Sequence, residues 1–293
     1  MAIKRSIGEK IFDAFNILAM IFLIIVTLYP LLYVIFASVS TPSRLIKHEG
    51  ILLAPLGFQL GAYKLVFRNP MITKGYLNTL FVVTVGTTVN IIMTSLGAYV
   101  LSRKGLYWKN LMMFIIVFTM FFGGGMIPTY LLVRSLKLTD TLWALIVPGA
   151  ISTYNMIIMR TSFMSIPDSL EESARIDGAK DLTILFKIVI PLSLPVIAVM
   201  ILFYGVGHWN AWFSALIYLR KRELYPLQLI LREVLISSDT TQMLAGLAGM
   251  DLEPIAETVK YATIVIATLP ILCIYPFLQK YFVKGVMIGA LKG

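Results

Sequence analysis

The sequence predicts an all-α, polytopic membrane protein with six transmembrane helices. Hydrophobic residues occupy 58% of its 293 positions and charged residues only 14%, whereas soluble domains carry about 25% charge. Apolar runs recur along the chain, and each is close to the roughly 20 residues that a helix needs to cross a bilayer. These runs override the one or two soluble domains that length alone would allow, so we expect residues 1–293 to form a single transmembrane domain.

The first predicted span covers residues 15–38 and follows the basic residues Lys4 and Arg5. This run is longer than the roughly 7–15 apolar residues of a cleaved signal peptide, so we expect it to remain as a transmembrane helix. The other five spans are predicted at 77–101, 111–133, 142–159, 195–219 and 261–282. The fourth of the six is short, and we expect it to extend past Arg160.

The third predicted span contains three successive glycines, residues 123–125, and then Pro128. Glycine and proline are tolerated in membrane helices when neighbouring groups satisfy the freed backbone. Two interpretations follow, and the sequence leaves both open. The glycines could form a kink or a close helix contact, or a break that lines a translocation path.

Charge alone does not fix the orientation of the spans. With the N-terminus inside, 13 of the 25 Lys and Arg residues fall on the inner side and 12 on the outer side. Six spans place both termini on one side, which we expect to be the cytoplasm, and the polar loop after the fourth span must settle the choice. Basic residues that flank spans account for most of the net charge of +10. Because no basic stripe is interleaved with aromatic residues, we expect no nucleic-acid partner.

Sequence motifs for catalysis are missing. The chain has no G-x-x-x-x-G-K-[ST], H-E-x-x-H or G-x-S-x-G run, so we expect it neither to hydrolyse ATP nor to act as an enzyme. With His48 and His208 as the only histidines, a histidine-rich metal site is not available. Cys273 is the single cysteine and lies in an apolar run, where we expect a small buried hydrophobe. We predict no catalytic residues, no metal and no cofactor bound by this chain.

Two longer segments lie on the predicted outer side. Residues 39–76 include a helical patch near 63–67, and residues 220–260 include helical apolar spacing at 227–236. Loops of this length are often functional, but interfacial helices that rest on the bilayer show the same pattern.

The polar loop at residues 165–191 has strong helix signals. Asp168 followed by Glu171 is a capping-box pattern, which predicts a helix over about 169–177. Gly178 suits the left-handed position that ends a helix. A second helix is expected over 181–190.

In this interpretation Pro191 stops the second helix and Pro195 opens the next span. The two helices form a helix–turn–helix elbow that a groove in a soluble partner could grip by shape and by ion pairs. An ordinary cytoplasmic loop with well-formed caps is the alternative.

This loop resembles the signature loop of ABC importer permeases, which reads E-A-A, three residues, G, nine residues, I-x-L-P. Here the pattern stands as Glu172-Ser173-Ala174, then Gly178, then Ile188-Val189-Ile190-Pro191, with matching spacing throughout. Ser173 in place of alanine and Ile190 in place of leucine are mild departures.

Other segments resemble the carbohydrate branch of that family, in particular the six-span subunit of the maltose importer. They are Asn78-Thr79-Leu80, residues 98–103 and the C-terminal residues 281–293, so the resemblance covers nearly the whole chain. Residues 123–128 and 275–282 are similar to permeases that import fragments of acidic polysaccharides such as alginate or pectin.

The resemblance implies the type I architecture of ABC importer permeases and an oligosaccharide permease that works by alternating access. The residues it implies for coupling to a cytoplasmic ATPase are Glu172, Ser173, Ala174, Asp177, Gly178, Ile188 and Pro191. Glu172 would contact the ATPase electrostatically, Ala174 would pack against it and Gly178 would set the elbow. The tail at 285–293 is a second expected contact.

The resemblance also implies the partners. We expect a second homologous permease subunit, two ATPase subunits that bind ATP and Mg, an extracytoplasmic solute-binding protein that contacts residues 220–260, the oligosaccharide, and membrane lipid. The expected location is the bacterial cytoplasmic (inner) membrane.

Polar and aromatic residues in the fourth and fifth spans form a candidate substrate path, because intramembrane polar groups usually face a bundle interior or a water-filled cavity. They are Asn155, Tyr204, His208, Trp209, Asn210 and Trp212. The alternative is an aromatic belt at the outer interface, with His208 hydrogen-bonded to a neighbouring helix.

An ion- or proton-coupled secondary carrier is the alternative function. Such carriers usually need ionisable groups inside their spans, and the predicted spans contain almost none. An intramembrane enzyme is a remote third possibility because the nucleophile and metal motifs are missing.

Overall fold

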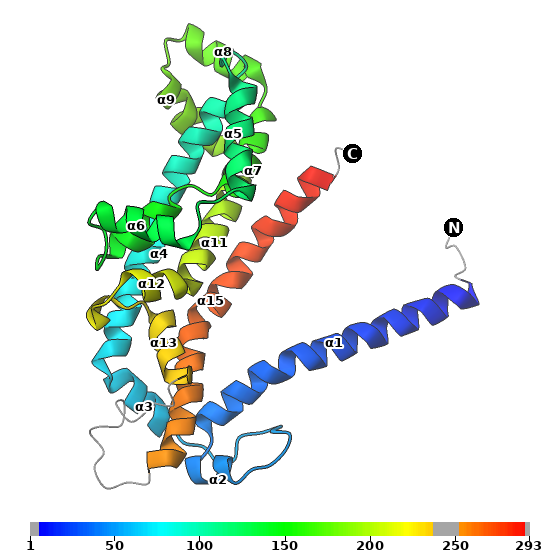
Figure 1. The fold of residues 1–293 in the computed structure, drawn as a ribbon. Coiled ribbons are helices and arrows are strands. Elements are labelled where there is room, and N and C mark those ends of the chain that lie inside the picture. Colours follow the sequence, from blue (N-terminus) through cyan, green and yellow to red (C-terminus); the bar gives the residue numbers. More distant parts are fainter. Residues whose placement is uncertain (1–5, 237–251, 291–293) are drawn as a thin grey trace. The chain divides into compact units, whose positions relative to one another are not determined.

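The computed structural model describes residues 6–236 and 252–290, and in these residues every regular element is a helix (Figure 1). Contacts divide the chain into two compact units. Unit 1 holds Met1–Asn69 with Glu233–Thr268, and unit 2 holds Pro70–Arg232 with Leu269–Gly293. The single domain remains a prediction.

Unit 1 begins with helix α1 (Ile7–Val39), which starts eight residues before the predicted span because Ser6 and Glu9 form a capping box. The unit also contains α2 (Pro42–Ile46), α3 (Gly61–Arg68) and the first part of α15 (Leu252–Ala290). The expected helical patch near 63–67 lies in α3. A hydrogen bond of 2.7 Å between Ser38 Oγ and Tyr63 Oη ties α3 to the end of α1.

Unit 2 is built around α4 (Pro70–Ser102), against which α7 (Thr153–Met164) and α11 (Leu194–Asn210) pack. The remaining helices of the unit are α5 (Lys109–Phe121), α6 (Met126–Ser135), η1 (Leu142–Leu145), η2 (Val147–Gly149), α8 (Asp168–Ile176), α9 (Asp181–Ile184), η3 (Leu185–Val189), α10 (Ile190–Leu192), α12 (Phe213–Tyr218), η4 (Arg222–Leu224) and most of α13 (Leu227–Ile236). The helix expected at 227–236 is confirmed as α13.

The described residues contain three continuous helices that are long and apolar enough to cross a membrane, in α1, α4 and α15. Three bent helix pairs raise the number to six if each pair is one span. The pair α5 and α6 bends by 110° at the glycine run, where Gly125 has φ +81°. The pair η1–η2 and α7 bends by 51°, and α7 extends past Arg160 as expected.

The fifth predicted span is not one helix. Helix α11 ends at Asn210 rather than continuing to residue 219, and the bend of 88° between residues 181–192 and α11 lies just before the predicted span. A short non-helical segment at Ala211 precedes α12. The apolar pattern continues through this segment, which is why hydrophobicity alone does not show the break.

The break before α7 is stabilised by side chains from its neighbours. Asn90 Nδ2 on α4 donates to the carbonyl of Gly149 at 2.6 Å, and the Ser152 amide donates to the Tyr204 hydroxyl on α11 at 3.0 Å. The Tyr204 hydroxyl also bonds Thr94 on α4 at 2.7 Å. Backbone groups freed at membrane depth need such partners, because lipid offers none.

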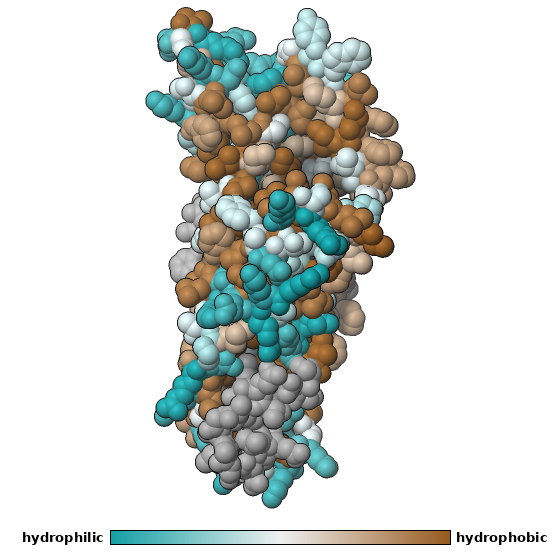
Figure 2. Space-filling view, turned by 60° about the vertical axis from the view of Figure 1, so that its left-hand side comes forward, coloured by the Kyte–Doolittle hydropathy of each residue, from teal (hydrophilic) through white to brown (hydrophobic). Residues whose placement is uncertain are grey.

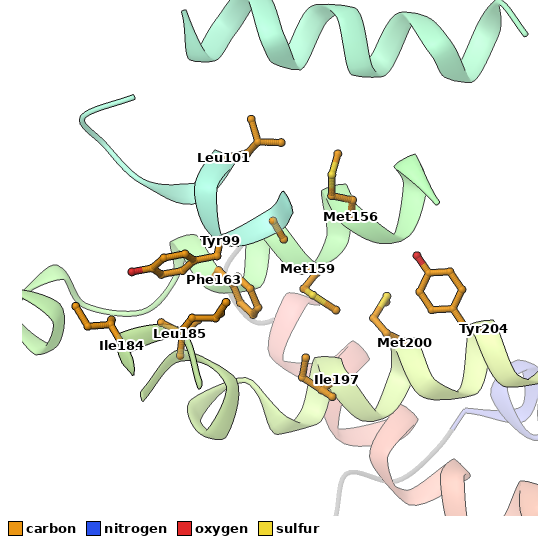
Figure 3. Close-up of a cluster of buried hydrophobic side chains, with 12 residues drawn as sticks. Tyr99, Leu101, Met156, Met159, Phe163, Ile184, Leu185, Ile197, Met200 and Tyr204 are labelled. Carbon is orange, nitrogen blue, oxygen red and sulfur yellow. The ribbon is translucent and has the colours of Figure 1, made fainter. Parts of the chain in front are cut away.

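The main core of unit 2 joins α4, α7 and α11 to the elbow loop (Figure 3). Its fully buried members include Met159 and Phe163 on α7, Met200 on α11, and Ile184 and Leu185 from the loop. The loop therefore shares one packed core with the spans on either side of it, and a packed core transmits displacement rather than absorbing it.

Charged groups gather at two levels along α4. The first, with the ion pairs of Arg103 and Lys104, lies at the elbow loop beyond Ser102, and the second, with the ion pair of Lys74 and Glu223, lies about two turns before Val82. Val82 and Ser102 are separated by a rise of about 30 Å along the helix, the thickness of a bilayer's hydrocarbon core. Figure 2 shows hydrophobic surface between a hydrophilic end and a second hydrophilic patch.

The second level is tied to α4 by polar contacts. Asn78 Nδ2 donates to the carbonyls of Glu223 and Tyr225, at 2.8 and 3.2 Å, and Thr79 Oγ1 accepts from the Leu227 amide at 2.9 Å. The expectation for Cys273 is wrong, because its side chain is exposed on α15.

We predict that Gly86→Ala destabilises unit 2. A Cβ at this position on α4 would stand 2.7 Å from His208 Nε2 and about as close to two other atoms of that ring. Overpacking of this kind costs roughly 1–3 kcal/mol, so the thermal midpoint of the purified protein should fall.

Gly207→Ala on α11 is the matched control, because a Cβ there meets nothing within 4 Å. It should leave the midpoint unchanged or raise it, since alanine favours a helix. Equal midpoints for both variants would show that α4 and α11 do not approach each other as closely as described.

Candidate functional site

The elbow at residues 165–191 has the turn that its sequence predicts. Helix α8 ends in a Schellman motif, in which the Ala179 amide donates to the Ala174 carbonyl at 2.9 Å and the Gly178 amide donates to the Arg175 carbonyl at 3.0 Å. Gly178 has φ +78°, a left-handed conformation that other residues adopt at a cost. The expected role of Gly178 as the turn residue is confirmed.

The expected capping box is wrong. Helix α8 already includes Asp168, its N-cap is Pro167, and no side chain caps it. Instead, Asp168 and Glu171 both form ion pairs with residues just beyond the end of α4. The acidic residues of the first turn still suit the positive end of the helix dipole.

A buried ion pair joins Glu171 to Arg103. The Glu171 side chain is buried, and Arg103 is held as well by the Ser102 hydroxyl and by stacking of its guanidinium over the Tyr99 ring at 4.7 Å. Burial lowers the pKa of Arg103 from its usual value, but guanidinium pKa values are so high that the group stays charged. Removing one partner would leave an unpaired buried charge, which is strongly destabilising.

A second, exposed pair lies beside the first. Lys104 Nζ donates to Asp168 Oδ2, and this hydrogen bond raises the pKa of Lys104. Exposed ion pairs contribute little to stability, so this contact orients the first turn of α8 less strongly than the buried pair does.

The outward side of the elbow combines charge with exposed apolar side chains. We call Glu172, Ser173, Ile176, Asp177 and Leu182 the elbow surface. All five are exposed, and Ile176 and Leu182 are 86% and 60% accessible. Large apolar side chains exposed beside acidic ones at a rigid turn are typical of a docking surface for a protein partner.

Two of the expected coupling residues lie on the inward side instead. Ala174 and Ile188 are partly buried and pack against the core that the loop shares with α4, α7 and α11. Their positions indicate that they hold the elbow to the core. Direct contact of these two residues with a partner stays a prediction.

The second helix of the elbow differs from the expectation. It runs from Asp181 to Leu192 with a π-helical stretch at η3, and Pro191 lies exposed inside it rather than after it. The chain turns at Ser193, which is buried, and Pro195 stands in the first turn of α11 as expected.

All six candidate path residues belong to unit 2, and four of them are buried or partly buried. Asn155, Tyr204 and Trp209 are buried, and His208 is half-buried with its Nε2 2.6 Å from Asn90 Oδ1. The expected hydrogen bond from His208 to a neighbouring helix is therefore present. Asn210 and Trp212 are exposed at the end of α11. A role for these residues in a substrate path stays a prediction.

A pocket of about 500 Å³ lies beside α4 and α11, and Trp209 is one of its lining residues. Most of its lining is aliphatic, with Ile91, Ile201 and Ile274 among the residues that form it. An apolar pocket suits hydrocarbon rather than the hydroxyl groups of a sugar.

Sequence reasoning missed the role of Arg103 and assigned Glu171 to a cap. The two residues are far apart in the chain and their pairing depends on the fold. The sequence did contain one signal for this pairing. Two basic residues follow the second predicted span, and the loop at 165–191 on the same predicted side carries acidic residues. In the part of the chain that the structure describes, no cluster of His, Cys, Asp and Glu could hold a metal ion.

Comparisons with known proteins agree with this architecture. The family model described as binding-protein-dependent transport system inner membrane component matches residues 4–288. The polygalacturonan/rhamnogalacturonan transport system permease protein YtcP of Bacillus subtilis is 44% identical over 285 residues, which are 97% of this chain and 99% of the relative. The arabinooligosaccharides transport system permease protein AraQ of the same species is 25% identical and covers 91% of each chain.

A solved structure is also similar. A chain from the crystal structure of a bacterial ABC transporter involved in the import of the acidic polysaccharide alginate superposes with a TM-score of 0.88 and is 33% identical, covering 96% of this chain and 100% of that chain. The expected architecture and the resemblance on which it was based are confirmed.

We predict that Glu171→Gln loosens α8. The change leaves the partly buried Arg103 guanidinium without its counter-charge, so the elbow should open more often. In limited trypsin digestion of the membrane-embedded protein, cleavage after the exposed Arg175 should accelerate by roughly tenfold or more, in line with the cost of breaking a buried pair.

Asp168→Asn is the control for this experiment because it removes the same charge from the exposed neighbouring pair. Its effect should stay below about 1 kcal/mol, or about fivefold in cleavage rate. Equal rates for Glu171→Gln and the unchanged protein would contradict the anchoring role of the pair.

Proposed function

We propose a specific transport role for this chain, which belongs to the family of binding-protein-dependent transport system inner membrane components. It is the permease subunit of an ATP-driven importer for oligosaccharides, and it works by alternating access. The energy enters through the elbow at 165–191, on which a separate cytoplasmic ATPase docks. The relatives named for sugar polymers support the substrate class.

The observation that carries this proposal is the construction of the elbow. Its outward side exposes Ile176, Leu182 and Glu172, while its inward side supplies Ile184 and Leu185 to the core of the spans. A partner that pushes on the elbow surface would therefore move the spans as well, because the elbow is packed into their core.

The mechanism follows from the anchors of the elbow. Arg103 and Glu171 fix α8 to the end of α4, and the turn at Ser193 joins the elbow directly to α11. Closure of two ATPase subunits around ATP and Mg would displace α8, and α4 and α11 would follow. The ligand shifts an equilibrium between outward- and inward-open states only by its differential affinity for them.

The partners follow from this role. A second, homologous permease subunit completes the path, and an extracytoplasmic solute-binding protein delivers the sugar to the outer side. The elbow side is cytoplasmic, which places both termini in the cytoplasm of a bacterial cell. Part of the expected outer contact loop, residues 237–251, and the last three residues of the expected tail contact lie outside the described residues.

The substrates we propose are fragments of acidic polysaccharides. YtcP is named for polygalacturonan and rhamnogalacturonan, and the similar solved transporter imports alginate. AraQ is named for arabinooligosaccharides but is less similar to this chain.

We predict that Glu172→Lys abolishes sugar-stimulated ATP hydrolysis and uptake while membrane insertion stays normal. The change reverses an exposed charge on the elbow surface, so it weakens docking without disturbing the core. The measurement is uptake in cells together with ATPase activity of the purified assembly. Glu49→Lys, which reverses an exposed charge in unit 1, should leave both activities intact. Normal uptake and normal sugar-stimulated ATP hydrolysis in Glu172→Lys would count against docking at the elbow.

Gly178→Pro should have the same effect for a different reason. Proline lacks the amide that bonds the Arg175 carbonyl and cannot adopt φ +78°, so the Schellman turn is lost. Gly178→Asn is the control, because asparagine tolerates the left-handed conformation. Retained coupling in Gly178→Pro would show that the turn geometry is not needed.

An ion- or proton-coupled secondary carrier would depend on the ion gradient instead of ATP. Collapse of the proton gradient with ATP held constant should leave uptake through this chain unchanged if a partner ATPase drives it. Loss of uptake under these conditions, with ATP levels verified, would favour the ion-coupled alternative.

A further inference from the structure

A guanidinium stacked on an indole lies at the end of unit 2 opposite the elbow. Arg232 on α13 places its guanidinium carbon 4.7 Å from the centre of the Trp212 ring, between α11 and α12. Trp212 is 37% exposed and contacts the ring of Phe213 edge-on at 5.5 Å. Two aromatic side chains and a cation therefore share one accessible surface.

Arg232 lacks an acidic partner within the described residues. Its side chain is half-buried, and the ion pairs and hydrogen bonds of the described part of the chain do not include it. A partly buried charge without a counter-charge is costly, and stacking on the indole offsets only part of that cost. The guanidinium is thus held in place by the indole, and within the described residues its N–H groups remain available to bind a ligand.

The backbone around the pair suits a ligand site. Helix α11 ends at Asn210, Ala211 is extended, and α12 starts only at Phe213. Irregular backbone at this depth is tolerated in membrane transporters where it lines a cavity or path. Asn210 is exposed beside the pair and adds an amide that can bond sugar hydroxyls.

The surrounding surface is positively charged. Arg134 in the last turn of α6 is exposed, and so are Lys137, Arg220 and Lys221 on two loops that Asp140 joins, because its Oδ1 accepts from the Arg220 amide at 2.6 Å. Basic residues of membrane proteins usually gather on the cytoplasmic side, whereas these cations lie on the opposite side from the elbow. Such a field raises the local concentration of anions.

We propose that Trp212 and Arg232 form a recognition site for a carboxylate-bearing sugar, a uronate unit of the transported oligosaccharide. The indole stacks on the sugar ring, and the guanidinium binds the carboxylate through two parallel hydrogen bonds. The site rests on the proposed import of oligosaccharides and specifies where this subunit contacts them and by which chemistry.

The test uses the complete assembly with its binding protein, in nanodiscs of phosphatidylcholine. ATP hydrolysis is measured at saturating binding protein with trigalacturonate and with an alginate trisaccharide, each compared with its methyl ester. Maltotriose and arabinotriose serve as neutral sugars. Arg232→Gln should lower the stimulation by the preferred uronate roughly tenfold or more, as loss of charged hydrogen bonds implies.

Two further variants separate charge from geometry. Arg232→Lys keeps the charge without the planar fork and should recover only part of the stimulation. Trp212→Phe keeps a ring for stacking and should retain more activity than Trp212→Ala. Arg134→Gln, the same substitution at an exposed cation without an aromatic partner, should change stimulation less than twofold.

The other outcomes overturn the inference in distinguishable ways. An equal loss with esters and neutral sugars would assign Arg232 to docking of the binding protein, and an effect seen only after adding phosphatidylglycerol would assign it to a lipid headgroup. A wild-type preference for the neutral sugars or the esters would refute uronate recognition but leave the importer intact. If none of these sugars stimulates hydrolysis, the proposed import of oligosaccharides fails, and this inference fails with it.

Discussion

The ion pair between Arg103 and Glu171 is the contact on which the rest of the elbow depends. It joins the end of α4 to the first turn of α8, and because Glu171 is buried and Arg103 is partly buried, water compensates poorly for the loss of either partner. A pair of this kind adds little net stability compared with apolar packing, but it allows only one position for α8. That single position lets Ile176 and Glu172 face outward while Ala174 faces the core.

The path from the elbow to the spans is continuous packing. Ile184, Leu185 and Val189 belong to the same core as Phe163 and Met200, so residues that look like a loop in the sequence behave as part of the helix bundle (Figure 3). Farther along α11, Tyr204 and His208 bond the backbone break before α7 and Asn90 on α4. A movement imposed on α8 would therefore reach the middle of the spans through contacts that have little room to yield.

The sequence predicted the parts of this arrangement that depend on local chemistry. Hydrophobic length located the spans, and the left-handed preference of glycine located the turn at Gly178. The missed features depend on distant residues. The pairing of Glu171 with Arg103 overrode the capping pattern, and the break after Asn210 is hidden because the apolar run continues across it. Arg232 stacks on Trp212, which lies between α11 and α12, and neither local sequence pattern indicates this contact.

Cross-linking at the elbow surface shows whether an ATPase subunit docks there. With Cys273→Ser as background, Ile176→Cys presents a thiol at a position that is 86% exposed, whereas Ala174→Cys presents one toward the core. The account predicts a strong cross-link from position 176 to an ATPase subunit, a weak one from position 174, and none from Ile51→Cys in unit 1, where the residue is also exposed. An assembled, transporting complex in which position 176 reaches no ATPase subunit would contradict the account.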